Sequence, residues 1–233
     1  MNTLRPSPHQ LVRTRPIRLA VYRKARLSLR RRVLDVGAGG GEVAAEMASR
    51  TDRRVWALDL DPAAHQAGGV IPVAGTAAAL PFADGTFDAV AFHFVLLWLR
   101  DPVACLREAR RVLASGGVAM ILSEPDLARR EDEPDAGLGA ALRAAVRRAG
   151  GHPDAGARLA GWLGQAGFRP DLCETPEEWV SIEDPQETDW EIEFLVSTGT
   201  LRGEEGTRLR KAMERGRPLR VRLPIAFGCG WRT

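Results

Sequence analysis

The sequence predicts an α/β fold in which a mainly parallel sheet is covered by helices on both faces. Short apolar runs alternate with helical patterns through the first half of the chain, which is typical of strand–helix–strand units with right-handed crossovers. A glycine-rich turn joins the first predicted strand to a helix. Two Asp-Pro pairs, Asp61-Pro62 and Asp101-Pro102, each combine an N-cap with a first helical residue. The three observations indicate one doubly wound sheet.

The predicted elements follow one another in this order. A helix is expected over about Pro16 to Arg30. Strands are expected at Val33–Val36, Arg54–Leu58, Val70–Val73, Ala89–Phe94 and Val118–Ser123, with helices beginning near Gly41, Pro62 and Pro102. Beyond Pro125 the regularity is lost, and we expect helices at Leu138–Arg148 and Ala155–Ala166 and a strand after Gly167-Phe168-Arg169-Pro170.

Composition limits the class of protein. Since 45% of the 233 residues are hydrophobic, the chain can form one domain with a full core. No apolar run approaches the ~18 residues of a membrane span, and a net charge of +3 does not indicate nucleic-acid binding. The cysteines, Cys105, Cys173 and Cys229, are widely spaced without a Cys-x-x-Cys pair, so neither disulfides nor a metal site is expected. We therefore expect a cytoplasmic protein.

The glycine turn indicates a bound cofactor. The apolar run Val33–Val36 leads into Gly37, Gly39 and Gly41, where no Cβ blocks the approach of a ligand. A dinucleotide fingerprint would place its third glycine where Glu42 stands, and no Gly-Lys-Ser/Thr follows to make a phosphate-binding P-loop. What fits is a nucleoside without phosphates whose cation Asp35 could help to hold, and this description matches S-adenosylmethionine.

A second acid stands where an adenosine needs one. Asp59 follows the second strand, and its two oxygens can accept hydrogen bonds from both ribose hydroxyls. Alternatively, Asp59 or Asp61 caps the helix at Pro62; we assign Asp61 to the cap and Asp59 to the ribose. A turn-rich loop then runs from Gly75 to Asp88, before a buried strand.

Together, the glycine turn, Asp59 and the loop with Leu80-Pro81-Phe82 closely resemble the class I S-adenosylmethionine-dependent methyltransferases of the type 11 branch. The resemblance covers roughly Arg32 to Ser123. It implies a Rossmann-like sheet of seven mainly parallel strands whose last strand is antiparallel, and Leu219–Phe227 could supply that strand. It also implies one domain over 1–233, with a helical extension (1–32), a cofactor-binding half (33–123), a variable acceptor-binding region (124–217) and a terminal strand (218–233).

The resemblance assigns the cofactor contacts. The turn from Asp35 to Gly41, with Ala38, would carry the methionine part, Asp59 and the adjoining Leu60 the ribose, and the loop after the third strand the adenine. Where relatives have an aspartate that accepts from the adenine amino group, this chain has Thr76. A hydroxyl accepts more weakly than a carboxylate. Cofactor affinity is then reduced, or adenine depends on backbone contacts from Ala77 and Ala78.

Three further residues are candidates for catalysis. His93 ends the fourth strand at the carboxyl edge of the sheet, where it could act as a base, orient a substrate or contact the cofactor, or could be a core histidine. Glu124 ends the fifth strand and could hold an amine or take a proton, or could be a solvated strand-end acid. Trp98 could stand beside the sulfonium as a cation–π partner, or could belong to the core.

The acceptor should be recognised by the irregular part of the chain. Pro170–Leu201 contains no Lys or Arg and many acids around Trp179 and Trp190, and we expect it to form a lid. Its charge could select a cationic or aromatic acceptor, match the Arg-rich N-terminal helix of the same chain or of a homodimer partner, or form a solvated face. Phe92-His93-Phe94-Val95 stands where relatives that methylate nucleic acids have an Asn/Asp-Pro-Pro-Tyr-type motif, so nucleic-acid substrates are not expected.

The sequence thus predicts methyl transfer to an oxygen, nitrogen or carbon of a small metabolite. The alternative is a non-catalytic protein that keeps the cofactor fold as a regulatory or assembly subunit, which the weakened adenine position at Thr76 would allow. An oxidoreductase on the same architecture is disfavoured by Glu42.

Overall fold

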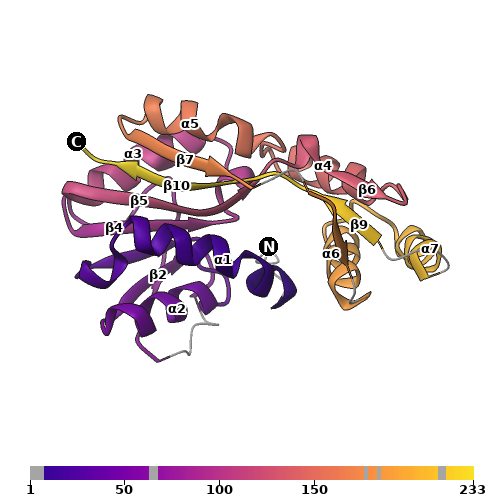
Figure 1. The fold of residues 1–233 in the computed structure, drawn as a ribbon, viewed down its shortest axis with the longest axis horizontal. Coiled ribbons are helices and arrows are strands. Elements are labelled where there is room, and N and C mark those ends of the chain that lie inside the picture. Colours follow the sequence, from indigo (N-terminus) through magenta and orange to yellow (C-terminus); the bar gives the residue numbers. More distant parts are fainter. Residues whose placement is uncertain (1–7, 63–67, 176–177, 183–184, 215–218) are drawn as a thin grey trace.

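The computed structural model describes residues 8–62, 68–175, 178–182, 185–214 and 219–233. Its main sheet has seven strands in the order β3-β2-β1-β4-β5-β10-β7 (Figure 1). The strands are β1 (Val33–Val36), β2 (Val55–Asp59), β3 (Val70–Ala74), β4 (Phe87–His93), β5 (Leu113–Pro125), β7 (Arg169–Glu174) and β10 (Ile225–Trp231). Strand β10 runs antiparallel to both of its neighbours, β5 and β7, while the pairs among β1 to β5 are parallel. The predicted sheet is confirmed.

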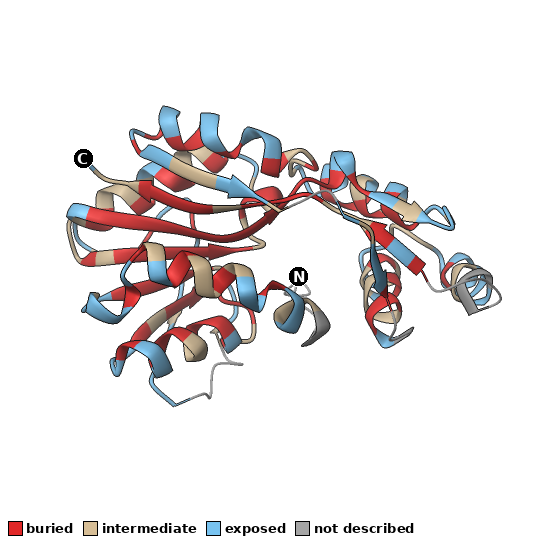
Figure 2. Cartoon of the chain, viewed as in Figure 1, coloured by how far each residue is buried: buried red, intermediate tan, exposed pale blue. Residues whose placement is uncertain are grey.

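Helices cover both faces of the main sheet. On one face lie α1 (Pro8–Lys24) and α2 (Glu42–Thr51), and on the other lie α3 (Pro102–Val112) and α5 (Ala155–Gln165). Side chains alternate between the faces along each strand. Val33 therefore packs with the α1 and α2 cluster while Leu34 packs with the α3 and α5 cluster. Figure 2 shows the sheet buried between helices whose outer faces are exposed.

A small lobe lies beside the carboxyl end of β5 (Figure 1). It contains a three-stranded sheet in the order β6-β9-β8, formed by β6 (Glu131–Glu133), β8 (Val180–Ile182) and β9 (Leu219–Arg222). Its helices are α4 (Leu138–Arg148), α6 (Pro185–Ser197) and α7 (Gly203–Glu214). The described residues also contain the short 3-10 helices η1 (Leu27–Leu29), η3 (Leu96–Trp98) and η4 (Leu127–Arg129). Within the described ranges, every helix is too short or too polar to span a lipid bilayer.

The N-terminal helix differs from its prediction. We expected it from about Pro16 to Arg30, but α1 begins at Pro8 and contains Pro16. It ends before Arg26, whose left-handed backbone (φ 51°) redirects the chain into η1. A proline usually weakens a helix interior. Here the buried contacts that α1 makes on both sides of Pro16 outweigh that cost.

The carboxyl-terminal prediction also needs correction. The expected single strand Leu219–Phe227 is two strands in different sheets, β9 in the small lobe and β10 in the main sheet. Pro224 lies between them, and a proline has no amide hydrogen with which to continue a ladder. Likewise, the expected lid does not begin at Pro170, because β7 is the edge strand of the main sheet.

The other predictions agree within a few residues. Asp101 caps α3 by accepting from Ala104 N at 2.8 Å, as expected. Strand β5 is longer than expected, since it begins directly after α3. The helix expected to begin near Pro62 falls on residues 63–67, outside the described residues.

Candidate functional site

The glycine turn after β1 has the backbone that a ligand cradle needs. Gly37, Gly39 and Gly41 all have positive φ angles, of 70°, 55° and 84°. The turn is attached to the neighbouring strand, because Gly37 N and Ala38 N both donate to Leu58 O, at 2.8 and 3.0 Å. A Cβ at Gly37 would lie 2.7 Å from Val95 Cγ2, so the space there also depends on glycine.

Asp59 joins the end of β2 to this turn. Its Oδ2 accepts from Gly39 N at 2.9 Å and its Oδ1 accepts from Asp61 N at 3.2 Å. Gly75 N donates to Asp59 O at 3.0 Å, which places the start of the predicted adenine loop beside the predicted ribose-binding acid. The adjoining Leu60 is 66% exposed, a position open to contact with a ligand. Motifs separated by twenty and sixteen residues thus meet at one edge of the sheet.

Asp35 lies beneath the turn with an unsatisfied carboxylate oxygen. The residue is 1% exposed, and its Oδ2 has no hydrogen-bond partner within the described part of the chain. Burial, with further contributions from the nearby Asp59 and Glu42 carboxylates, raises the pKa of Asp35 to about 8. A buried acceptor of this kind is stabilised by a cation or a hydrogen-bond donor placed beside it. The residues of the turn therefore fit a cationic ligand.

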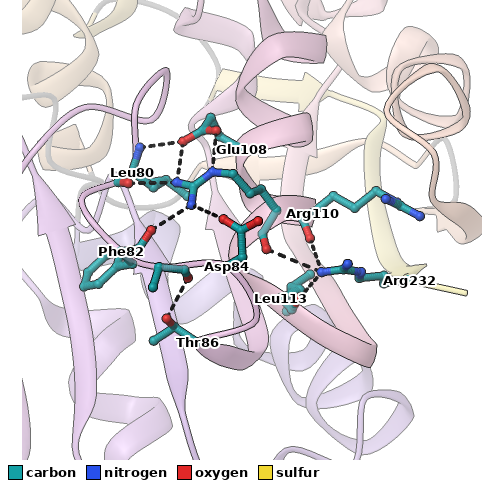
Figure 3. A network of polar contacts seen from close by, with 10 residues as sticks. Leu80, Phe82, Asp84, Thr86, Glu108, Arg110, Leu113 and Arg232 are labelled. Atoms are coloured by element: carbon teal, nitrogen blue, oxygen red, sulfur yellow. Dashed lines mark hydrogen bonds and ion pairs between the residues drawn. The ribbon is translucent and has the colours of Figure 1, made fainter.

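The loop between β3 and β4 is held by one arginine of α3. Arg111 donates to the carbonyl oxygens of Leu80 and Phe82 and pairs with Asp84 and Glu108, and Figure 3 shows this group together. The Glu108 carboxylate also accepts from Leu80 N at 2.9 Å. These contacts hold the loop against α3 through both its backbone groups and the Asp84 side chain.

The predicted adenine residues lie at the start of this loop. Thr76 is exposed, and its Oγ1 accepts from Ala78 N at 3.3 Å, while Ala77 is buried. The hydroxyl is thus used in a local turn. Whether Thr76, Ala77 and Ala78 contact adenine stays a prediction.

His93 is part of a buried polar cluster with α1. Its Nε2 lies 3.3 Å from Thr14 Oγ1, which donates its single hydrogen to Gln10 O at 2.6 Å and accepts from Arg18 at 2.8 Å. The imidazole Nε2 must therefore carry the hydrogen of the contact with Thr14, which leaves Nδ1 as the acceptor. Burial and the nearby Arg18 charge lower the pKa of His93 to about 3, so the ring is neutral.

A pocket of about 100 Å³, here called the turn pocket, brings together three predicted residues from distant segments. Gly37, His93 and Trp98 all line it. Phe94 also lines it with a left-handed backbone (φ 56°), a strained conformation that is common at functional sites. The remaining lining residues are Gln10, Leu97, Pro125, Leu127, Arg130, Leu142, Trp190, Glu191, Phe194 and Leu223. Its aromatic wall includes Trp98 edge-on to Phe194, with Trp190 stacked on the same ring.

Glu124 has a different environment from the one expected for a catalytic acid. It is fully buried, and its carboxylate accepts from Leu96 N at 3.1 Å and from Leu97 N at 2.9 Å. Burial raises the pKa of Glu124 to about 8, although these backbone amides act in the opposite direction. The contacts attach η3, which carries Trp98, to the end of β5.

A second pocket, of about 290 Å³ and here called the lobe pocket, lies between α1 and the small lobe. It shares five lining residues with the turn pocket: Gln10, Phe94, Arg130, Glu191 and Leu223. The others are Arg13, Thr14, Ile17, Thr175, Glu178, Val180, Ile182, Glu187, Thr188, Leu219, Val221 and Ile225. The two pockets are therefore neighbours that share Phe94 and four other lining residues.

Sequence reasoning missed two sources of pocket residues. The first is α1, which supplies Gln10 and Thr14, and the second is Arg130, a 6% exposed residue of the small lobe. The Arg-rich composition near the N-terminus concealed α1, since its polar contacts are to distant elements. A buried arginine cannot be distinguished from a solvated one in Arg129-Arg130 from sequence alone.

The acids of 170–201 are largely paired within the chain. Glu187 pairs with Arg13 of α1, Glu191 with Arg130, and Glu174 with Arg129. Arg210 of α7 contacts both Asp189 and Glu193. Of these pairs, only Glu187 with Arg13 matches the expected pairing with the Arg-rich N-terminal helix, whereas the others are with arginines elsewhere in the chain.

Gly39→Val should abolish or greatly weaken binding of S-adenosylhomocysteine, the demethylated product of the predicted cofactor. A branched side chain at φ 55° costs about 1–2 kcal/mol in backbone strain and occupies the expected path of the methionine part. Calorimetric titration measures the effect, with Gly161→Val on the open face of α5 as the control. Normal binding by Gly39→Val would exclude the turn as the cofactor cradle.

Asp35 should make the ligand-free protein progressively less stable as the pH rises from about 4 towards 8. Between these values the folded chain keeps the Asp35 proton that the unfolded chain has released, since the pKa is raised from 3.8 to about 8. Glu124 acts in the same direction. Thermal unfolding across this range should show a shallower decline in Asp35→Asn than in the wild type. Parallel profiles would show that Asp35 ionises normally.

The chain resembles known methyltransferases in sequence. Residues 34–121 match a family model described as a methyltransferase domain. A demethylmenaquinone methyltransferase of Mycolicibacterium vanbaalenii is 40% identical over 105 residues, which are 43% of this chain and 45% of that protein. The chain spans less than half the length of the first curated relatives that it matches, at 43%, 45% and 44%.

Solved structures share the fold. A candidate methyltransferase of Bacillus halodurans has a TM-score of 0.64 at 19% identity, covering 92% of this chain and 98% of that one. A SAM-dependent methyltransferase of Aquifex aeolicus has a TM-score of 0.56 at 15% identity, covering 98% and 95%. These likenesses confirm the Rossmann-like fold that the resemblance implied.

Proposed function

Residues 34–121 belong to the methyltransferase domain family, in the type 11 branch of class I, and we propose that the protein transfers a methyl group from S-adenosylmethionine to a small-molecule acceptor. The observation that supports this most is the convergence at the glycine turn. Gly37, His93 and Trp98 line one pocket, and the buried Asp35, with its unsatisfied oxygen, lies in β1 two residues before Gly37.

The cofactor would be held by groups at the carboxyl edge of the sheet. The turn from Gly37 to Gly41 would receive the methionine part, with the buried Asp35 carboxyl group two residues before it in β1. Asp59 would accept from the ribose hydroxyls. The loop at Thr76, fixed by Arg111, would border the adenine. This arrangement follows the order of the motifs along the strands.

S-adenosylmethionine supplies a methyl group that its sulfonium has already activated, so the chain has to align the acceptor and exclude water. His93 is neutral and buried, and a pKa of about 3 makes it a weak base. Its role would be to orient the acceptor by a hydrogen bond. Trp98 would form an aromatic wall beside the positive charge. Glu124 would act as a positioning residue for η3 through its contacts with Leu96 and Leu97.

Two measurements test the proposal. Calorimetry should show one binding site for S-adenosylhomocysteine, and methyl transfer from labelled S-adenosylmethionine should appear with at least one member of a library of small metabolites. Product binding without transfer to any acceptor would favour the alternative, a non-catalytic protein on the same fold. Absence of product binding would reject both.

Trp190→Ala should depress turnover or raise the acceptor KM while leaving the affinity for S-adenosylhomocysteine nearly unchanged. Trp190 lines the turn pocket and stacks on Phe194, at 6.1 Å between ring centroids. Trp179→Ala is the matched control, because Trp179 instead contacts Arg220 and Arg222 on the small lobe's sheet. Of the two tryptophans expected to bind the acceptor, Trp190 is the one that lines the turn pocket, which supports this role for Trp190. Equal losses in the two variants would assign Trp190 to folding rather than to the acceptor.

A further inference from the structure

We propose that the lobe pocket binds the apolar body of an uncharged acceptor, whose reacting end passes Phe94 into the turn pocket. The inference rests on the proposed function and names the chemical class of the acceptor. The lobe pocket itself, of about 290 Å³, lies near the lower end of the roughly 300–1,000 Å³ usual for small-molecule sites.

Aliphatic side chains from several elements form a large part of its wall. Ile17 comes from α1, Val180 and Ile182 from β8, Val221 from β9, and Ile225 from β10. Each is branched at Cβ and has a limited number of rotamers. A ligand against this wall gains free energy chiefly from removing apolar surface from water.

Four of the five charged residues that line the pocket are already paired with one another. Arg130 makes two hydrogen bonds to Glu191, each of 2.9 Å, and a third to Asp132 at 2.8 Å. Arg13 pairs with Glu187, which is 8% exposed. The remaining charged lining residue, Glu178, is exposed to solvent.

This pairing argues against a charged acceptor body. An ion entering the pocket would lose its hydration and find its potential partners engaged, which is unfavourable for either sign of charge. The expectation of a cationic acceptor came from the acids of 170–201 counted without Arg13 and Arg130. These two arginines pair with two of the three acids that line the pocket, and the third, Glu178, is exposed to solvent. A neutral apolar molecule meets no such penalty.

The position of the pocket connects it to the reaction. Phe94 lines both pockets, and the turn pocket also contacts Gly37 of the cofactor cradle and His93. A molecule that lies in the lobe pocket and extends past Phe94 therefore reaches the glycine turn. This is the turn to which we assign the methionine part of the cofactor. Gln10, whose backbone oxygen accepts from Thr14 beside His93, lines both pockets.

The test uses three probes that share one alkyl chain: 1-octanol, protonated octylamine and octanoate. Each is titrated calorimetrically into the wild-type protein saturated with S-adenosylhomocysteine. We expect octanol to bind at a single site at least tenfold more tightly than either ion. Tighter binding of octylamine or octanoate would overturn the inference.

Variants of α1 locate the octanol site. Ile17→Trp should fill the lobe pocket and weaken octanol binding at least tenfold with unchanged affinity for S-adenosylhomocysteine. Val12→Trp is the control on the same helix, because Val12 is 74% exposed. If Ile17→Trp unfolds, Val180→Trp replaces it, since Val180 lines the pocket yet is 42% exposed. Equal octanol affinity in the filled and control variants would reject the site.

The outcomes separate the inference from the proposed function. Wild-type protein that fails to bind S-adenosylhomocysteine contradicts the proposed function. Two outcomes contradict the inference alone in protein that binds S-adenosylhomocysteine. Either octanol does not bind, or it binds equally well with and without Ile17→Trp.

Discussion

Replacing Asp59 by alanine should weaken the binding of S-adenosylhomocysteine about ten- to a hundredfold. Loss of one charge-assisted hydrogen bond costs about 1.5–3 kcal/mol, which corresponds to that range in Kd. Asp59 also accepts from Gly39 N at 2.9 Å, so its removal loosens the glycine turn itself. The measurement is calorimetric titration of the variant.

Two further variants test whether the loss of affinity is specific to the charge and position of Asp59. Asp59→Asn keeps a carbonyl oxygen for Gly39 N while removing the charge, so it should lose less affinity than Asp59→Ala. Asp154→Ala removes an aspartate that pairs with Arg158 on α5, on the face of the sheet opposite α1, and should bind normally. Unchanged affinity in Asp59→Ala would remove this residue from the cofactor site.

Arg130→Met should destabilise the protein by about 3–5 kcal/mol, the range for breaking a buried ion pair from one side. The Arg130 side chain is 2% exposed and its partners Asp132 and Glu191 are 3% and 14% exposed. The substitution leaves two nearly buried carboxylates without their cation. Urea unfolding monitored by circular dichroism gives the change in free energy of unfolding.

Two comparisons support the interpretation of Arg130→Met. Arg158→Met removes an ion pair whose side chains are 54% and 38% exposed, and should cost about 0–1 kcal/mol. Adding Glu191→Leu to Arg130→Met should recover part of the loss, because one unpaired carboxylate disappears. Equal destabilisation by Arg130→Met and Arg158→Met would show that the buried network contributes no more than a surface pair.

Local patterns were sufficient to predict the cofactor half. A strand that leads into alternate glycines, an acid at the end of the next strand and an Asp-Pro helix start each depend on residues close together in the chain. Parallel strands then bring their carboxyl ends to one edge, so Gly39, Asp59 and Gly75 meet as expected. The antiparallel strand was expected from the family resemblance, but its predicted boundaries were wrong. The chain passes from β9 of the small sheet to β10 of the main sheet at Pro224.

The sequence by itself determined the fold class, the glycine turn and the family resemblance, because these depend on hydrophobic period and on short motifs, such as alternate glycines that readily adopt positive φ angles. Only the tertiary structure decided that α1 lies against His93, that Arg130 is buried, and that Arg13 neutralises Glu187. The partners in these contacts are 79, 61 and 174 residues apart. No local pattern specifies a pairing at such a separation, since burial and charge compensation are properties of the packed chain.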